Sequence, residues 1–466
     1  MRRRALSTND HASPRRSLDD VTHCGLHPRH RSDHGQHVHC PTAAPFYGDH
    51  VLYQHYSLLP GRPVIRAWEF NGWQRETMSW KTGCYIHAGL SDGGSQIVKG
   101  SGARDYLQSL VINSLDPFPI GSMKHTVMLT DEGLIHAHGI IERQSDEEFH
   151  CFAGAPPGPL LPTAPPAGVE ISRLQNYLFQ IAGPTSLQVL EKACGQSLRD
   201  IKFLHFRTPV TIAGVQTEVA RIGMSGNLAY ELHGPYDEGP AMYDAVYQAG
   251  QDLGIERLGW GAYLVNHVEG GFPQVTWTFT MAVAPEMWPM ISPVWQVSGS
   301  VDPADMRART RTPVEVRWHN MARFDHDFPG RAVLEAEVAN PKRTTVTLRW
   351  NHDDVIDIYA SMLRPGSIYK PIDLPYAPQR WPMAHADHVT RSGTEIGWSS
   401  GTIYSHHYRE FLSLGCIDLD ATDIGTEVIV HWGDHGGTIK EVRATVERFP
   451  YLADTRNSDI DVSKLT

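Results

Sequence analysis

The stretch that most constrains the fold of this chain is residues 221–273, where a strand-like run is followed by a helix. Glu231 lies in a run that stops at Gly234 and Pro235, two residues that interrupt regular structure. A strand that ends there directs the Glu231 carboxylate toward whatever the sheet covers. A lone Glu in a strand is more often solvent-facing, so the pattern alone leaves both interpretations open.

The helix that follows carries polar residues on one face. Tyr263, Asn266 and Glu269 are each three positions apart, and residues at that spacing are neighbours on a helix surface. Such a face is more often solvated than functional. A role for these residues in a site therefore needs a second argument.

Both halves of this stretch resemble the folate-binding signature of the aminomethyltransferase family, the family of the glycine-cleavage T-protein. Tyr230 and Glu231 stand in its Gly-Tyr-Glu-like strand, and Glu269 stands in its Leu-Glu-Ala-Gly-like segment. T-proteins carry an Arg six residues before the second Glu, whereas this chain carries Tyr263. A Tyr at this position is similar to the tetrahydrofolate-dependent aromatic O-demethylases of the vanillate and syringate type. The resemblance extends over roughly residues 66 to 455.

The resemblance implies an α+β fold of the T-protein type, with two similar α+β units in a ring and a C-terminal β-barrel-like domain. The expected boundaries are 46–175 for the first unit, 176–290 for the second unit with the folate signature, 291–340 for a connecting segment and 341–466 for the β-rich domain. The expected activity is transfer of a methyl group from an aryl methyl ether, such as a lignin-derived methoxy-aromatic, to N5 of tetrahydrofolate. Two alternatives stay open: an aminomethyl or N-methyl donor, and a folate-binding relative without turnover.

The resemblance also assigns roles to residues. Glu231 is expected to hold the pterin through paired charge-assisted hydrogen bonds, with Tyr230, Asn266 and Glu269 as further cofactor-binding candidates. Tyr263 is the expected acid, because a phenol of pKa about 10 is matched to a departing phenolate.

His138 is the second catalytic candidate. It stands where T-protein relatives have the second acid of a Gly-x-x-x-Asp-Asp-like turn, and imidazole accepts a proton near neutral pH. The alternative is that His136 and His138 are two residues on the same face of a strand. Two further departures from the family are His87, at the end of a segment where T-proteins have Leu-Phe-Asp, and Gly154, where the O-demethylases have an Arg. Loss of that Arg suggests a substrate other than vanillate or syringate.

The strand, glycine and helix pattern occurs twice. A strand over 95–98 and a helix over 103–111 join at Gly100, and a strand over 179–181 and a helix over 186–193 join at Gly183. This repeat indicates two similar α+β units. Between them, residues 153–166 hold six prolines, which predicts a stiff extended linker. A further amphipathic helix is expected over 240–253, and strands are expected over 346–350, 395–398, 413–417 and 427–431.

Composition narrows the class of protein. A formal charge of −11 argues against a nucleic-acid partner, because neutralising phosphates takes a basic surface. The chain has no run of about 18 apolar residues, so a membrane span is not expected. Its six cysteines form no Cys-x-x-Cys pair, which is typical of a reducing cytoplasm, and the expected partners are small molecules.

Residues 1–45 differ from the rest of the chain. They lack the apolar segment of a secretory signal and are rich in histidine, with seven between positions 11 and 39. No His or Cys pair there has zinc-finger spacing, so no metal is expected. We expect this segment to be disordered.

A serine hydrolase is the remaining alternative, because Ser91 and Ser399 each lie in a Gly-x-Ser-x-Gly run. A nucleophile elbow requires a buried strand before the serine and a helix after it. Neither run has both, so this activity is not expected.

Overall fold

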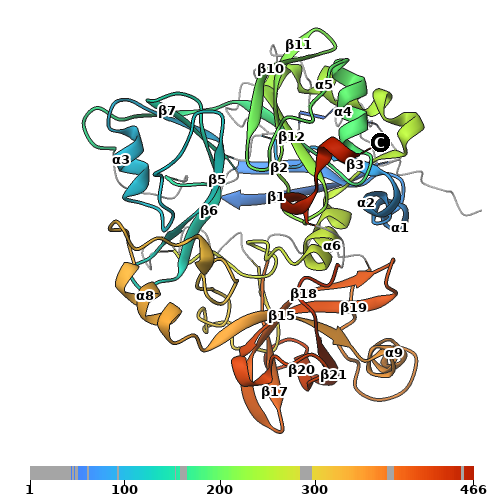
Figure 1. The fold of residues 1–466 in the computed structure, drawn as a ribbon. Coiled ribbons are helices and arrows are strands. Elements are labelled where there is room, and N and C mark those ends of the chain that lie inside the picture. Colours follow the sequence, from blue (N-terminus) through green and yellow to red (C-terminus); the bar gives the residue numbers. More distant parts are fainter. Residues whose placement is uncertain are drawn as a thin grey trace, which may run out of the picture. The chain divides into compact units, whose positions relative to one another are not determined.

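The computed structural model (Figure 1) describes residues 43–44, 47, 51–59, 62–91, 94–152, 154–157, 165–283, 296–374, 383–452 and 456–465. Two open sheets and a closed barrel organise this part of the chain.

The first sheet has five antiparallel strands in the order β5-β6-β7-β4-β8. They are β4 (Gln96–Lys99), β5 (Met123–Leu129), β6 (Ile135–Arg143), β7 (Glu148–Phe152) and β8 (Glu170–Arg173). Helix α3 (Ala103–Gln108) buries Ala103 and Leu107 against Val98 and Phe149 of this sheet. This burial fixes the helix on the sheet.

The second sheet has six strands in the order β10-β11-β12-β9-β3-β13. They are β3 (Cys84–His87), β9 (Asn176–Ala182), β10 (Phe206–Ile212), β11 (Val215–Ala220), β12 (Ala229–Pro235) and β13 (Ile255–Arg257). Only the β13–β3 pair is parallel among the pairs of this sheet. Strand β9 is buried along its whole length, because both faces of the sheet are covered there.

Helices cover the second sheet on both faces. Helices α4 (Ser186–Cys194) and α5 (Gly239–Ala249) share a hydrophobic cluster with Tyr230, while α6 (Trp260–Gly270) shares another cluster with Ala229. Successive residues of a strand point to opposite faces, so α6 lies on the face away from α4 and α5. This is the face toward which Glu231 points.

Glycines make both strand-to-helix turns that the sequence predicts. Gly100 and Gly183 have φ angles of 120° and 131°, a region that other residues rarely adopt. A Cβ atom at either position would also collide with a backbone carbonyl, that of Gly168 or Gly83. Both predicted strand, glycine and helix units are therefore present, and each requires a glycine at its turn.

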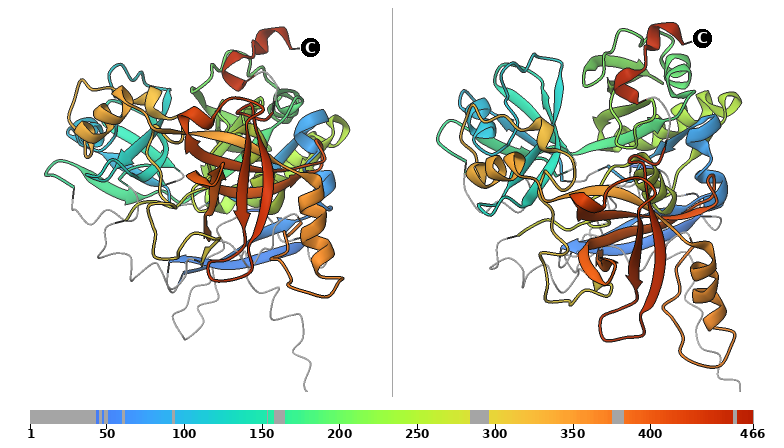
Figure 2. Two further views of the ribbon diagram at one scale, coloured as in Figure 1. Left: turned by 90° about the horizontal axis from the view of Figure 1, so that it is seen from below. Right: turned by 60° about the horizontal axis from the view of Figure 1, so that its bottom comes forward.

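The C-terminal barrel closes in the order β15-β19-β18-β17-β20-β21 (orange to red in Figure 2). Its strands are β15 (Arg343–Trp350), β17 (Asp387–Arg391), β18 (Thr394–Ser405), β19 (Glu410–Asp418), β20 (Glu427–Trp432) and β21 (Lys440–Glu447). Helix α9 (His352–Ser361) begins after Asn351, whose side chain accepts hydrogen bonds from two backbone N–H groups, as an N-cap does.

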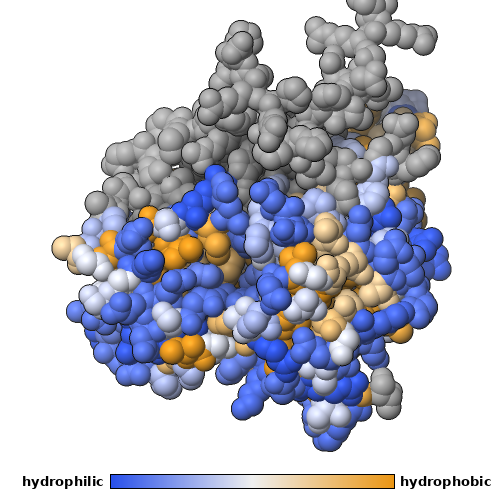
Figure 3. All heavy atoms as spheres, turned by 90° about the horizontal axis from the view of Figure 1, so that it is seen from above, coloured by the Kyte–Doolittle hydropathy of each residue, from blue (hydrophilic) through white to orange (hydrophobic). Residues whose placement is uncertain are grey.

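Shorter elements join these parts. They are the hairpin β1 (Leu52–Leu59) and β2 (Arg62–Glu69), helices α1 (Trp73–Glu76) and α2 (Ser79–Thr82), the parallel pair β14 (Gln296–Ser298) and β16 (Met383–His385), and α8 (Arg331–Ala339). No helix in the described ranges is long and apolar enough to cross a membrane. On the face shown in Figure 3, hydrophobic side chains lie in scattered groups among hydrophilic ones.

The predicted fold class is confirmed by these sheets and the barrel, with one difference in connectivity. Strand β3 lies within the range predicted for the first unit, yet it pairs with β9 and β13 of the second sheet. The helix predicted over 240–253 ends at Ala249 and continues as a 3-10 turn, Gln251–Leu253. Most of residues 1–45 and the middle of the proline-rich linker, 158–164, lie outside the described residues, and the exact domain boundaries stay a prediction.

Candidate functional site

Glu231 lies on β12 with its carboxylate buried against the neighbouring strand. It is paired in register with Gln180 of β9 and is 6% exposed. Gln180 Nε2 donates to Glu231 Oε1 at 3.4 Å, and His233 Nε2 lies 3.3 Å from Oε2. Both distances exceed the about 2.7–2.9 Å of a strong charge-assisted bond. The carboxylate therefore keeps capacity for a better donor.

A polar chain connects Glu231 to helix α6. The Tyr85 hydroxyl, from β3, donates to Gln180 Oε1 at 2.6 Å and lies 3.3 Å from Asn266 Oδ1. Asn266 is fully buried, and its Nδ2 has no hydrogen-bond partner among the described residues. The structure therefore brings Glu231 and Asn266, two of the predicted cofactor-binding residues, into one buried polar chain.

Tyr263 lies one helical turn before Asn266, between two imidazole rings. His87 stacks on it with ring centroids 4.0 Å apart and an interplanar angle of 13°, and His267 meets it at 4.2 Å and 72°. Its hydroxyl lies 4.0 Å from Met224 Sδ. Burial, with the charges of Tyr85 and Glu231, raises the pKa of Tyr263 well above its usual value. The phenol is therefore neutral at physiological pH and keeps a proton that it can donate.

The two imidazoles beside Tyr263 are neutral as well. His87 Nδ1 lies 2.9 Å from the Leu258 carbonyl oxygen, and His267 Nδ1 lies 2.8 Å from the Tyr263 carbonyl oxygen. A carbonyl only accepts, so each Nδ1 carries the proton and each Nε2 is an acceptor. Burial lowers the pKa of His87 to about 3 and that of His267 to about 4. This part of the site thus has uncharged polar groups around a neutral phenol.

His138 lies on β6 in an aromatic cluster with Phe272, Phe279 and Trp318. Its Nδ1 is 3.2 Å from His125 Nε2, and burial, with the neighbouring His125, lowers the pKa of His138 well below its usual value. Ring contacts run from His138 through Phe272 to His267. His138 and Tyr263 therefore belong to one continuous group of rings, although these contacts do not join them directly.

Tyr230 and Glu269 have other surroundings. Tyr230 points to the opposite face of β12 from Glu231 and packs in the cluster under α4 and α5, where burial raises its pKa to about 12. The Glu269 carboxylate contacts Ser405 Oγ at 2.6 Å, Lys81 Nζ at 3.0 Å and Trp80 Nε1 at 3.3 Å. These three partners of Glu269 favour a structural role, in which it joins α6 to the barrel. Cofactor binding by Tyr230 or by Glu269 stays a prediction.

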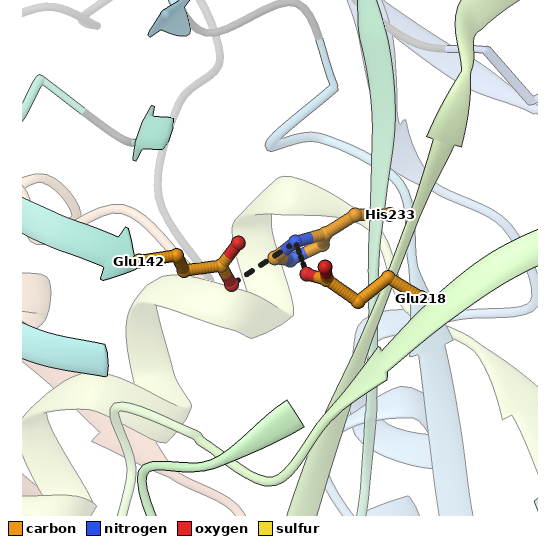
Figure 4. Close-up of side chains that lie close together, drawn as sticks. All are labelled: Glu142, Glu218 and His233. Atoms are coloured by element: carbon orange, nitrogen blue, oxygen red, sulfur yellow. Dashed lines mark hydrogen bonds and ion pairs between the residues drawn. The ribbon is translucent and has the colours of Figure 1, made fainter. Parts of the chain in front are cut away.

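A buried group of ionisable residues was not predicted from the sequence. Glu142 of β6, Glu218 of β11 and His233 of β12 point toward one another (Figure 4), with ligand-type atoms within 4.8 Å. His233 Nδ1 lies 3.1 Å from Glu218 Oε1 and 3.4 Å from Glu142 Oε1. Burial, together with Glu218, raises the pKa of Glu142 well above its usual value. No local motif marks this group, because its residues come from three strands and two sheets.

The two serines of the Gly-x-Ser-x-Gly runs make structural contacts. Ser91 Oγ donates to the Leu178 carbonyl oxygen at 3.2 Å, and Ser399 Oγ donates to Ser413 Oγ at 2.8 Å. Both serines are fully buried. Neither hydroxyl is arranged as a nucleophile by these contacts.

Comparison with known families agrees with this arrangement. The profile of the GCVT N-terminal domain matches residues 47–287, slightly more than half of the chain. The chain belongs to the GCVT family. The match includes β12, α6 and the polar chain between them, so the predicted family is confirmed.

Two relatives match over most of their length. The chain is 35% identical over 420 residues to the sesamin methylene transferase of Sinomonas sp. (strain No.22), covering 85% of this chain and 92% of that protein. It is 28% identical over 436 residues to the syringate O-demethylase of Sphingobium sp. (strain NBRC 103272 / SYK-6), covering 87% and 93%. These relatives confirm the prediction of an enzyme of the transferase and demethylase class of the family.

A solved structure supports the fold. The crystal structure of glycine cleavage system aminomethyltransferase T from Bartonella henselae matches with a TM-score of 0.62 and 15% identity, covering 87% of this chain and 96% of that chain. At this identity the likeness bears on the fold alone. It confirms the predicted T-protein fold.

Proposed function

We propose that this chain is a tetrahydrofolate-dependent transferase that takes a one-carbon unit from an oxygen atom of an aromatic ether. The observation that carries this proposal is the fully buried Tyr263 phenol, which lies one helical turn before Asn266, the residue that the buried polar chain connects to Glu231. The candidate acid for the departing oxygen and the acidic residue that would hold the pterin are thus parts of one buried site.

The residues around Glu231 fit tetrahydrofolate. Glu231 has only long contacts, at 3.3 and 3.4 Å, and Asn266 Nδ2 is buried without a partner in the described part of the chain. A pterin offers N–H donors and acceptors on one edge, which would satisfy both groups. Glu231 would hold that edge, with Gln180 and Asn266 beside it. When bound, tetrahydrofolate supplies the nitrogen that accepts the carbon.

Tyr263 acts on the leaving group. An aryl ether is inert at neutral pH unless its oxygen receives a proton or a strong hydrogen bond as the C–O bond breaks. The phenol of Tyr263 donates that proton to the departing aryl oxide, which would be buried in the same site, so the burial that raises the pKa of Tyr263 raises the proton affinity of both oxygens. His87 and His267 hold the Tyr263 ring between them, and their uncharged state suits an uncharged ether.

His138 has a secondary place in this proposal. Burial and the neighbouring His125 lower its pKa and keep it neutral, so it can accept a hydrogen bond from a substrate hydroxyl but is a weak base. The aromatic rings around it would pack against an aromatic substrate.

The carbon transferred is either a methyl or a methylene group. A methyl ether delivers its methyl to N5 and releases a phenol. A methylenedioxy ring, in which one carbon bridges two aryl oxygens, delivers that carbon to N5 and N10 and releases a catechol. The relative with 35% identity is named as a methylene transferase and the relative with 28% identity as an O-demethylase, so both donors are candidates.

The test is incubation of the purified protein with tetrahydrofolate and three donor sets: methoxylated aromatics, methylenedioxy aromatics, and N-methyl glycines as amine donors. Mass spectrometry distinguishes 5-methyltetrahydrofolate from 5,10-methylenetetrahydrofolate. We expect one of these products with an aromatic oxygen donor and none with the amines. Product from the amines alone, or no product while tetrahydrofolate binds, would overturn the proposal.

A further inference from the structure

We propose that Glu142, Glu218 and His233 bind a divalent transition-metal ion, of which Zn²⁺ is the best match, and that this ion orients Glu231 through His233. The three side chains converge from β6, β11 and β12 (Figure 4). They are nearly inaccessible, with side-chain exposures of 0% for Glu142, 9% for Glu218 and 6% for His233.

The spacing of the three ligands matches a coordination shell. Zinc binds His nitrogen and carboxylate oxygen at about 2.0–2.2 Å, so two ligands of a tetrahedral ion are separated by about 3.3–3.6 Å. His233 Nδ1 is 3.1 Å from Glu218 Oε1 and 3.4 Å from Glu142 Oε1. The second separation equals such an edge, the first is slightly shorter, and all three ligand-type atoms lie within 4.8 Å of one another, so small side-chain shifts would complete the shell.

The neighbouring amide directs both carboxylates to the same point. Gln144 Nε2 donates to Glu142 Oε2 at 3.2 Å and to Glu218 Oε2 at 2.9 Å. The remaining oxygen of each carboxylate therefore faces His233. Glu142 Oε1 is buried and has no contact shorter than the 3.4 Å from His233 Nδ1, so this oxygen can take up a ligand bond.

The second nitrogen of His233 gives independent support. A histidine that binds a metal usually donates its other ring N–H to a carboxylate, which fixes the tautomer and the ring. His233 Nε2 lies 3.3 Å from Glu231 Oε2. Binding of an ion at Nδ1 would leave the proton on Nε2, where it bonds to Glu231.

Charge favours an ion at this position. Three carboxyl groups, those of Glu142, Glu218 and Glu231, surround one imidazole in the interior, and a buried group of this kind needs compensating positive charge, which a divalent ion would supply in place of protons. Imidazole and carboxylate ligands together suit Zn²⁺ or Mn²⁺ better than Ca²⁺, which prefers an all-oxygen shell. The ion would also join the two sheets, because Glu142 belongs to the first and the other ligands to the second.

The test measures metal content in the full chain. Wild type, Glu142→Gln and His233→Gln are stripped with a chelator, mixed with Zn²⁺, dialysed and analysed by inductively coupled plasma mass spectrometry. The control is His352→Gln, which removes an exposed histidine that contacts Glu410 at 2.6 Å. The histidines of residues 1–45 are present in every variant, so zinc bound there cancels in the comparison.

We expect the wild type and the His352→Gln control each to retain one more zinc per chain than either site variant. Added zinc should raise the unfolding temperature of the wild type and of the control, and should leave that of the two site variants unchanged. X-ray absorption of the wild-type zinc protein, which requires no variant to fold, should show one imidazole and two or more oxygen ligands. Equal zinc content in all four proteins, or an absorption spectrum of several imidazoles, would overturn the proposal and leave protons as the neutralising charge. The role of the ion in orienting Glu231 rests on the proposed function. Metal content is measured without any turnover, so the metal site and the proposed function can be refuted separately.

Discussion

Replacement of Tyr263 by Phe tests the acid directly, because it removes the phenol oxygen and leaves the ring. The ring keeps its stacking contact with His87 at 4.0 Å. The lost hydroxyl lies 4.0 Å from Met224 Sδ and also interacts with the Gln180 side chain. We expect the free energy of unfolding to fall by about 1 kcal/mol, the net contribution of one hydrogen bond.

The rate should respond far more than the stability. A positioned acid contributes about 10²–10⁴-fold, and Tyr263 is completely buried, so bulk water is poorly placed to replace it. We expect kcat to fall by about 10³-fold, which corresponds to about 4 kcal/mol of transition-state stabilisation. Single-turnover formation of the folate product measures this fall, and titration of tetrahydrofolate should give an unchanged Kd.

Tyr85→Phe is the matched control, because it removes the hydroxyl of the other buried tyrosine near Gln180. The Tyr85 hydroxyl donates to Gln180 Oε1 at 2.6 Å, and loss of this donor leaves a buried acceptor unsatisfied at a cost of about 1–3 kcal/mol. Tyr85→Phe should thus lower the unfolding free energy more than Tyr263→Phe and the rate much less. A Tyr263→Phe rate within threefold of wild type, or equal rate losses in both variants, would refute the assignment of Tyr263 as the acid.

Three further outcomes are expected. Glu231→Gln removes the charged partner of the pterin and should weaken tetrahydrofolate binding by about 10–100-fold, measured by calorimetry; unchanged binding would contradict its role. Lys81→Met leaves the buried Glu269 carboxylate without its cation and should lower the free energy of unfolding, measured in urea, by about 3–5 kcal/mol. Adding Glu269→Gln to this variant should recover part of the loss; no recovery would show that the two residues are not coupled. Burial lowers the pKa of His87 to about 3 from about 6.5 in the unfolded chain, so its contribution to stability is complete above pH 6.5 and is lost as the pH falls toward 3. His87→Gln should therefore make the free energy of unfolding less dependent on pH by about 1.4 kcal/mol per pH unit between these values, and an unchanged slope would show that His87 is protonated in the native state.

Local patterns predicted the parts of the site that lie within one stretch of chain. Gly234 and Pro235 mark the end of β12, and the three-residue spacing of Tyr263, Asn266 and Glu269 matches α6. These features depend on turn chemistry and helical period, both of which a sequence displays directly. The family resemblance then supplied what periodicity lacks, namely which polar side chains belong to a site.

Contacts between distant strands were not predictable in the same way. Glu142 and His233 are 91 positions apart, and the Lys81–Glu269 pair spans 188 positions. The helical spacing predicted one functional face for Tyr263 and Glu269, but Lys81 of α2 and Ser405 of β18 engage the second residue. Such pairings follow from sheet order, which no local period encodes.

The pairing of β3 with the second sheet explains two departures from the family at once. The resemblance to T-proteins places an acid at the His87 position and an Arg at the Tyr263 position, and the structure stacks these two residues on each other at 4.0 Å. An acid and an Arg at such a distance would form a buried ion pair, which requires both charges to be retained. Here both positions hold neutral aromatic groups, so neither substitution leaves an unpaired charge. Two charged side chains at these positions are thus replaced by two uncharged side chains that can still form hydrogen bonds. Uncharged surroundings favour an uncharged aryl ether over a charged amine as the donor.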